Sequence, residues 1–336
     1  MAEPTSAAER GALRQDWPVP RQELAGTRGG ALAWLEFQLV RTLVGGLARL
    51  PAPLRRALVG ALARLARRLD RRRTRAAEVF LRQALGPELP REELARRTLQ
   101  AWRHLFEMTL DAERFRLSVP PERVRERFEV ELAPEVRELL ARREGCVLVT
   151  AHVGDWEIGS AILPWLGFDP LYSIAKPPKN RYLAAHLQRL REARGIRLLP
   201  RRGAMQFAPA VVRAGGTLAM LLDQRGRVKP VLAPFFGRPA RCDRSASVLL
   251  RRLKVPLVFA AGYRAGADLR WRFVATRVVR PAEVAGASPE EIATLVNREL
   301  EQLILVAPEQ YFWLHERWRG AEQEAGIQEE AREAES

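Results

Sequence analysis

Short apolar runs alternate with helix-like stretches through the middle of the chain, between residues 146 and 224. Runs at 147–151, 171–175, 196–199 and 217–222 have the length and the β-branched content of buried strands. In the stretches between them, apolar residues recur every three or four positions, as on one face of a helix. Strands that alternate with helices predict an α/β fold, in which a mainly parallel central sheet is flanked by helices.

The same patterns extend the fold toward the C-terminus. Gly266 to Asp268 separate two strand-like runs and indicate a hairpin. Ser288, followed three residues later by Glu291, is a capping box that opens a helix. The predicted elements are a strand at 231–236, a helix at 243–253, strands at 257–263 and 269–279, a helix from the capping box to about 306, and a short helix at 308–319.

An apolar segment dotted with arginines occupies residues 30–73 and is interrupted at Pro51 and Pro53. In its second half the leucines fall on one helical face, which is typical of a helix lying in a membrane interface among anionic headgroups. A helical hairpin packed on the domain with a solvated basic face is the alternative, and residues 31–50 are apolar enough for deeper insertion. The leucines are Leu54, Leu58, Leu62, Leu65 and Leu69.

These patterns divide the chain into four predicted regions, and the segment 30–73 is the second of them. Residues 1–29 are polar and contain proline, so we expect a disordered tail without a cleavable signal peptide. Residues 74–319 form the α/β domain, and residues 320–336 an acidic disordered tail. The domain opens with two helices, and His104 lies in their apolar stripe, where a packing or surface role is favoured over a catalytic one.

Basic residues outnumber acidic ones by 56 to 40, which gives the 336-residue chain a formal net charge of +16. Such an excess favours an anionic partner: nucleic acid, acidic lipid or an acidic protein. High arginine usage by the genome is the alternative explanation. The two cysteines, Cys146 and Cys242, have no metal-ligand spacing and are expected to be reduced thiols. No run of about 18 uninterrupted apolar residues marks a transmembrane helix.

Residues 146–166 place an ionisable base where an α/β fold binds its ligands. The first apolar strand is followed by His152, Gly154 and Asp155, and the last of these has the position of a helix N-cap. Open α/β sheets bind ligands at the carboxyl ends of their strands. His152 is therefore a candidate general base, and a hydrogen-bonded structural histidine is the alternative from this motif alone.

Two carboxylates are candidates to orient this base. Glu157 follows His152 by five residues; a continuous helix would place the two about 140° apart, but the turn into the helix can bring them together. Asp223 ends another predicted strand, and neighbouring strand ends can present both residues at one edge. A carboxylate on one ring nitrogen leaves the other nitrogen as the base. Backbone N–H groups at 154–157 can meet developing negative charge.

Motifs of several other enzyme classes are missing. The chain has no serine in a GxSxG elbow, no P-loop, and no GxGxxG after a predicted strand. A histidine base without an obvious protein nucleophile points to direct deprotonation of a substrate hydroxyl.

The segment His152-Val-Gly-Asp-Trp-Glu157 resembles the HxGNWE motif of the bacterial late lipid A acyltransferases (the lauroyl/myristoyl acyltransferase family), within the lysophospholipid acyltransferase superfamily. Two residues depart from the family pattern: Asp155 replaces the usual asparagine, and Arg225 stands where an acidic residue is frequent. Further segments similar to family motifs follow in order: Asn180, Arg189-Leu-Arg191 with Gly195, Leu222-Asp223-Gln224, Pro234 to Ala240, and Pro308 to Trp313 with Arg317.

The resemblance implies an O-acyltransferase on the cytoplasmic face of the bacterial inner membrane, peripheral or monotopic. It would transfer an acyl chain from acyl carrier protein (acyl-ACP) or acyl-CoA to a glycolipid hydroxyl, most simply of a lipid A precursor, with no cofactor or metal. His152 would be the base and Glu157 or Asp223 its partner. A glycerophospholipid or mannoside acceptor and a non-catalytic lipid- or nucleic-acid-binding protein are the alternatives. The implied substrate-binding residues are Arg189, Arg191, Asn180, Gly154 and Trp156.

Overall fold

A seven-stranded sheet forms the centre of the computed structural model, which describes residues 17–266 and 269–321. Its strand order is β1-β9-β8-β2-β5-β3-β4, and the neighbouring strands run parallel except for the antiparallel pair β8–β9. The predicted α/β fold with a mainly parallel sheet is therefore confirmed. The strands of this sheet are β1 (Phe128–Leu132), β2 (Cys146–Thr150), β3 (Leu171–Ala175), β4 (Ile196–Pro200), β5 (Thr217–Leu221), β8 (Leu257–Arg264) and β9 (Trp271–Val279).

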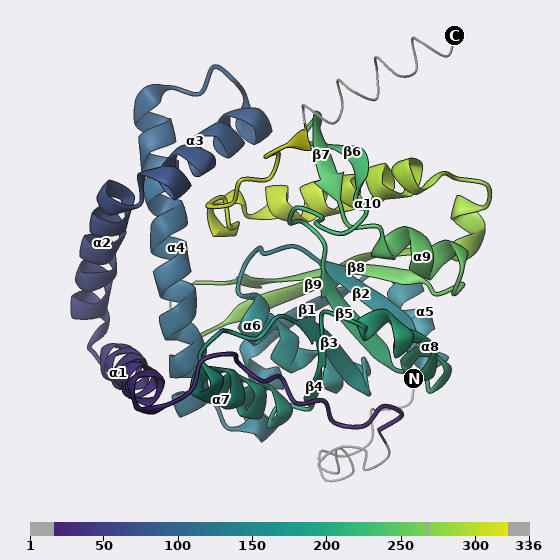
Figure 1. The fold of residues 1–336 in the computed structure, drawn as a ribbon, viewed down its shortest axis with the longest axis horizontal. Coiled ribbons are helices and arrows are strands. Elements are labelled where there is room, and N and C mark those ends of the chain that lie inside the picture. The colour runs from purple at the N-terminus through teal and green to yellow at the C-terminus, as the bar shows by residue number, and fades with distance from the viewer. Residues whose placement is uncertain (1–16, 267–268, 322–336) are drawn as a thin grey trace.

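Helices cover both faces of this sheet (Figure 1). Apolar side chains of α8, α9 and α10 pack on one face, and those of α5 and α6 on the other. The four central residues of β2 are buried on both sides, as expected of a strand between two helical layers. The helices are α1 (Ala31–Ala48), α2 (Ala52–Leu69), α3 (Arg71–Leu85), α4 (Arg91–Ser118), α5 (Pro134–Ala141), α6 (Trp156–Gly159), α7 (Arg181–Glu192), α8 (Ala208–Arg213), α9 (Ser245–Arg251) and α10 (Pro289–Val306).

The first four helices stand together at one side of the molecule, where α4 contacts each of the other three and separates α2 from the sheet (Figure 1). Helix α2 packs against α4 and buries Val59, Gly60 and Ala63. Its leucine-bearing face lies outside: Leu54, Leu65 and Leu69 are all more than half exposed. Three of the five leucines predicted to share this face are thus on the surface, while Leu58 and Leu62 are partly buried.

Helix α1 is long and apolar enough to cross a membrane by length and composition, with a mean hydropathy of 1.2 and only 22% of its residues buried. Among residues 17–266 and 269–321, no second helix meets the same criteria. Its outer face carries Leu32, Leu35, Leu39 and Leu43, which are 52–80% exposed. An apolar face this open to water is a candidate membrane-contacting surface.

The predicted helix at 155–166 is much shorter than expected. Helix α6 ends at Gly159, and two 3-10 turns follow, Ser160–Ile162 and Pro164–Leu166. Pro164 carries no backbone N–H and so cannot continue an α-helix. The predicted helix at 308–319 is wrong: after one 3-10 turn at Pro308–Gln310 the chain is mostly irregular.

Two strands were missed by the sequence patterns. Strand β1 alternates partly buried and exposed residues at the edge of the sheet, within a segment rich in charge. Strand β7 (Arg238–Cys242) pairs with β6 (Val231–Phe235) in a separate two-stranded sheet. Residues Phe236 and Gly237 form the turn between β6 and β7, both with positive φ, as hairpin turns of this length require.

The two predicted tails lie largely outside the described residues. Residues 17–29, expected to belong to a disordered tail, instead lie against the domain: Val19 and Leu24 are buried. The backbone of Val19 exchanges two hydrogen bonds of 3.0 Å with the hydroxyl of Tyr172. At the other end only Gly320 and Ala321 are described, and Ala321 is buried.

Candidate active site

Strands β2 and β5 are neighbours and end at the same level of the sheet, because Thr150 pairs with Leu221. From β2 the chain passes to β3, which lies on the far side of β5. From β5 the next strand of this sheet is β8, which lies on the far side of β2, so the two connections leave in opposite directions. Open α/β sheets bind their ligands where connections diverge in this way. His152 follows β2 and Asp223 follows β5, so both lie at this switch point.

Asp223 holds the imidazole of His152 through two contacts. Its Oδ1 lies 2.8 Å from Nδ1 of the ring, and its Oδ2 accepts a 3.1 Å hydrogen bond from the backbone N–H of the same histidine. A third bond of 3.1 Å comes from the hydroxyl of Tyr311 to Oδ2. Because a carboxylate only accepts hydrogen bonds, Nδ1 carries the ring proton and Nε2 presents a lone pair. The tautomer is that of a general base at Nε2.

The electrostatics of this site keep Asp223 ionised. Burial alone would raise the pKa of its carboxyl, but the hydrogen bonds from His152 and Tyr311, together with the positive charge of His152 when its ring is protonated, outweigh burial and lower the pKa. Burial and the neighbouring charge of Asp223 raise the pKa of Tyr311, so its hydroxyl stays protonated and donates. The nearby His315 is partly buried, and this desolvation lowers its pKa to about 4 and leaves it neutral.

The loop after His152 is fastened to two other segments. The backbone N–H of Gly154 donates to the carbonyl of Gln310 at 2.8 Å, and that of Phe312 donates to the carbonyl of His152 at 2.9 Å. The N–H of Asp155 donates to the carbonyl of Gly262 at 2.9 Å. The expectation that N–H groups at 154–157 form an anion site is therefore wrong for residues 154 and 155, whose N–H groups already have partners.

Glu157 does not reach His152. Its carboxylate forms a bidentate ion pair with the guanidinium of Arg191 on α7, with one contact at 3.0 Å. The indole of Trp156 occupies the space beside the imidazole instead, edge to face, with ring centroids 5.0 Å apart. Successive residues of a helix point about 100° apart, so Glu157 is turned away from the ring that Trp156 touches. Of the two candidate carboxylates, Asp223 is the one in contact with the base.

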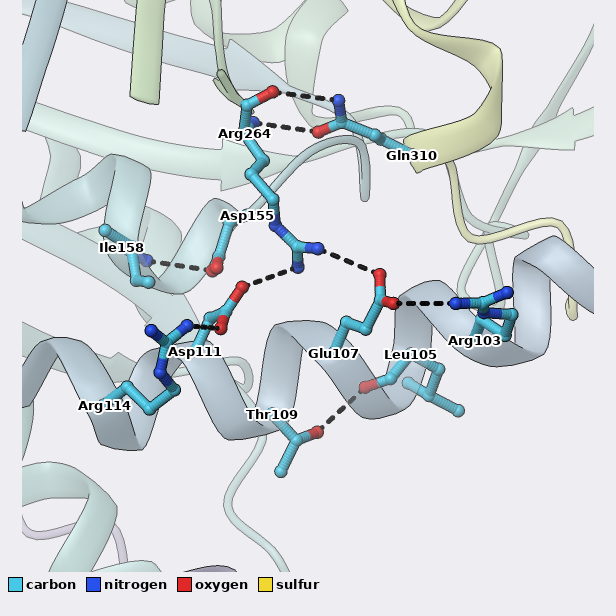
Figure 2. Close-up of polar contacts among 10 residues, drawn as sticks. All are labelled: Arg103, Leu105, Glu107, Thr109, Asp111, Arg114, Asp155, Ile158, Arg264 and Gln310. Carbon is cyan, nitrogen blue, oxygen red and sulfur yellow. Dashed lines mark hydrogen bonds and ion pairs between the residues drawn. The ribbon is translucent and has the colours of Figure 1, made fainter. Parts of the chain in front are cut away.

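Beneath this loop lies a buried group of charges centred on Arg264, the last residue of β8 (Figure 2). Its guanidinium pairs with two carboxylates of α4, Glu107 at 2.9 Å and Asp111 at 3.0 Å. The side-chain amide of Gln310 brackets the backbone of Arg264 with bonds of 2.8 and 3.2 Å. Since the carbonyl of Gln310 also holds Gly154, this group ties α4, β8 and the active-site loop together.

Asp155 lies beside this group and is fully buried (Figure 2). Its Oδ1 accepts a 3.3 Å hydrogen bond from the N–H of Ile158, so it caps α6 as predicted. Its Oδ2 has no hydrogen-bond partner within the described parts of the chain. Burial raises the pKa of this carboxyl to about 8, although the charge of Arg264 acts in the opposite direction.

Residues 30–320 match the family model of the bacterial lipid A biosynthesis acyltransferases. The chain belongs to this family. It is 24% identical over 203 residues to the lipid A biosynthesis palmitoleoyltransferase of Escherichia coli (strain K12), and equally to the lipid A biosynthesis acyltransferase of Shigella flexneri. The alignment covers 60% of this chain and 64% of each relative, less than two thirds of their length. The resemblance seen in the motifs is confirmed.

Two of the family-motif residues expected to bind substrate have hydrogen-bond or ion-pair partners within the fold. Asn180 is buried and caps α7, because its Oδ1 accepts from the N–H groups of Tyr182 and Leu183 at 3.0 and 3.2 Å. Its Nδ2 donates to the carbonyl of Ala33 at 2.7 Å and so joins α7 to α1. Arg191 is engaged by Glu157. Both side chains thus have partners within the fold, and substrate contact stays a prediction for them.

Arg189 keeps its side chain in solvent on the exposed face of α7. Within residues 17–266 and 269–321 its guanidinium has no hydrogen bond or ion pair. In the same described ranges, no group of three His, Cys, Asp or Glu side chains is arranged to hold a metal ion. His104 is buried on α4, where burial lowers its pKa to about 3, and is a packing residue as predicted.

Gln224 and Tyr311 contact the base and its partner, yet sequence reasoning gave neither a role. The amide nitrogen of Gln224 lies 3.3 Å from Nε2 of His152. Its position directly after Asp223 at a strand end was a usable signal. Tyr311 lacked such a signal, since it comes from a segment expected to be helical, and its backbone pairing with Val153 joins residues far apart in the sequence.

A Gly154→Ala substitution is expected to destabilise the fold by about 2–4 kcal/mol. Gly154 has a φ of +63°, and a Cβ there would lie 2.0 Å from the carbonyl oxygen of Gly262. Chemical denaturation would measure the free energy of unfolding. Gly46→Ala is the matched control, because a Cβ at this position of α1 meets nothing within 4 Å; alanine is the better helix former, so stability should stay equal or rise. Equal effects of both substitutions would contradict the close approach at Gly154.

Proposed function

We propose that this protein is an O-acyltransferase that moves a fatty acyl chain from an acyl thioester to a hydroxyl group of a glycolipid, a lipid A precursor. Membership of the lipid A biosynthesis acyltransferase family supports the reaction class and the acceptor. The observation that carries the chemistry is the 2.8 Å contact of Asp223 with Nδ1 of His152, which leaves Nε2 as a base at the switch point of the sheet.

The reaction follows from this arrangement. Nε2 of His152 takes the proton of the acceptor hydroxyl while the hydroxyl oxygen attacks the thioester carbonyl carbon. The imidazolium that forms is stabilised by the buried carboxylate of Asp223. The tetrahedral intermediate then collapses: the carbon–sulfur bond breaks, the ester remains, and the proton on Nε2 passes to the departing sulfur. No protein nucleophile, cofactor or metal is needed beyond the acyl thioester, which is a co-substrate.

The donor is acyl-ACP or acyl-CoA, since both present a thioester on a phosphopantetheine arm. The formal net charge of +16 supports association with an acidic carrier protein as well as with anionic lipid. Of the two arginines predicted to bind substrate, Arg191 pairs with Glu157. Arg189 is exposed on α7, so its guanidinium can bind a phosphate group of the donor or of the acceptor.

Acyl transfer to a glycolipid requires contact with the membrane, and the outer faces of α1 and α2 supply it. The exposed leucines of α1 lie on one side of the helix, and α1 joins α7 through the bond from Asn180 to Ala33. We place the protein on the cytoplasmic face of the bacterial inner membrane, as a peripheral or monotopic protein, because acyl thioesters are cytoplasmic substrates.

A Leu39→Glu/Leu43→Glu double substitution is expected to weaken binding to vesicles of anionic phospholipid by at least about tenfold. Burying one leucine side chain contributes about 1.5–3 kcal/mol, and each glutamate adds repulsion from the headgroups. Vesicle co-sedimentation measures the effect. The matched control is Leu305→Glu/Val306→Glu, which alters two exposed apolar residues of α10 and should leave binding unchanged. Loss in both variants, or in neither, would contradict a membrane surface on α1.

An assay with defined acceptors tests the function. The purified full-length protein receives acyl-ACP or acyl-CoA together with a lipid A precursor, a glycerophospholipid or a mannoside, and mass spectrometry detects the acylated product. The expected result is one added acyl chain on the lipid A precursor. Acylation of a glycerophospholipid or mannoside alone would replace the acceptor in the proposal. No acylation of any acceptor, with DNA bound in a mobility-shift assay, would overturn the proposal.

A further inference from the structure

The base nitrogen of the site already has a partner in the structure. Since Asp223 fixes the ring proton on Nδ1, Nε2 of His152 can only accept, and the amide of Gln224 3.3 Å away is the donor. Gln224 directly follows Asp223, so β5 positions the partner of Nδ1 and the donor to Nε2 with two consecutive residues. The amide therefore lies where an acceptor hydroxyl must approach the base.

Negative charge develops beside this nitrogen when a thioester is attacked, and four backbone N–H groups of the neighbouring loop already have partners. The N–H groups of Gly154 and Asp155 are bound to carbonyl groups. Those of Ile158 and Gly159 are bound to the side chain and backbone of Asp155. A hydrogen-bond donor beside the developing oxyanion stabilises it, and the amide of Gln224 is a side-chain donor 3.3 Å from Nε2.

We propose that Gln224 is a catalytic residue whose amide N–H stabilises the oxyanion of the tetrahedral intermediate; the inference rests on the proposed acyl transfer. The acceptor hydroxyl displaces the amide from Nε2 and donates its own hydrogen bond there. The released N–H then donates to the thioester carbonyl oxygen, which becomes the oxyanion as the hydroxyl oxygen bonds to the carbonyl carbon. Its proton passes to Nε2, and the charge returns to the sulfur when the carbon–sulfur bond breaks.

The geometry favours this role over simple blocking of the base. The attacking oxygen lies about 2.8 Å from Nε2 and about 3 Å from the carbonyl carbon. The carbonyl oxygen is then close enough to Nε2 for the amide of Gln224 to reach it by a change of rotamer. Gln224 is only partly buried, so its side chain has room to turn. The same amide thus protects the unoccupied base and serves the transition state.

Gln224→Met and Gln224→Ala test the inference in the full-length protein with the acceptor that the wild type acylates. Loss of one oxyanion donor lowers kcat by about 10²–10³-fold, and we expect this loss with KM for donor and acceptor changed by less than about threefold. Methionine keeps the length of the side chain without an N–H, so cavity formation cannot explain its effect. The control is Gln206→Met, at an exposed glutamine outside the site, with wild-type kcat expected.

Three outcomes would overturn the inference. A kcat/KM equal to or above that of the wild type would mean that the amide only blocks the base. A raised KM with unchanged kcat would make Gln224 a ground-state binding residue. A lower free energy of unfolding in both variants, with kcat recovering at temperatures where the variants are fully folded, would make Gln224 a structural residue. If the wild type itself acylates no acceptor, the proposed function fails, a result that is distinct from an active wild type with equally active variants.

Discussion

An Asp223→Asn variant is expected to transfer acyl chains with a kcat lowered by about 10³–10⁴-fold, while its fold is retained. In serine proteases the same substitution beside a catalytic histidine has an effect of this size because the ring adopts the wrong tautomer. Here an asparagine amide would donate to Nδ1 of His152, so the ring proton would move to Nε2. A nitrogen that carries the proton cannot accept another from the hydroxyl. Steady-state kinetics with the acylated acceptor as readout measures the loss, and His152→Ala sets the floor of the assay.

Glu157→Gln is the matched control for the tautomer itself. Glu157 pairs with Arg191, and its replacement leaves both contacts of Asp223 with His152 in place. Nitrogen NMR shifts of the imidazole distinguish the two tautomers directly, whatever the effect on turnover. We expect the Nδ1–H form in the wild type and in Glu157→Gln, and the Nε2–H form in Asp223→Asn. The Nε2–H form in Glu157→Gln, with the Nδ1–H form kept in Asp223→Asn, would make Glu157 the partner of His152.

An Asp155→Asn variant is expected to be more stable than the wild type at and above neutral pH. Burial raises the pKa of Asp155 to about 8, against about 3.9 in an unfolded chain. A carboxyl whose folded-state pKa is raised contributes stability that is complete below about pH 4 and is lost as the pH rises through about 8. The loss between pH 5 and pH 8.5 is on the order of 3 kcal/mol. Asparagine caps a helix equally well and has no charge to bury.

The measurement is the difference in free energy of unfolding between variant and wild type at pH 5, 7 and 8.5. The difference isolates Asp155, because buried His104 and His315, with pKa lowered to about 3 and about 4, make stability rise with pH in both proteins. Asp70→Asn is the control: Asp70 caps α3 near the surface, and its hydrogen bond from the backbone of Arg73 lowers its pKa. Its contribution does not change above pH 5, and a flat difference for Asp155→Asn would contradict the raised pKa.

Sequence reasoning reached the strands and the position of His152 because both depend on local pattern. Buried parallel strands are continuous apolar runs, so β2, β3, β4 and β5 were predicted within two residues. The carboxyl ends of parallel strands share one edge, so His152 and Asp223 could be paired before any coordinates were known. The choice between Asp223 and Glu157 was out of reach, because it depends on the rotation of α6 against its neighbours.

The C-terminal segment shows why other predictions failed. Its aromatic residues suggested a helix, but the backbone at Gln310 and Phe312 pairs with the loop at His152 and Gly154, and that tertiary pairing has no local signal. The same holds for Arg191. It was predicted to bind phosphate, but the packing of α6 near α7 places the carboxylate of Glu157 against its guanidinium. Hydrogen-bond partners distant in sequence decided these outcomes.

The pairing of residues 310–312 with the loop after β2 also sets the order in which the molecule matures. The last strand of the described sheet ends at Val279. The loop that carries His152 is held by backbone groups about thirty residues later, and Asp223 accepts a hydrogen bond from the hydroxyl of Tyr311 in the same segment. During synthesis on the ribosome, the framework can therefore assemble while the base is still loosely held. The contacts of the site are complete only when residues 310–312 have left the exit tunnel.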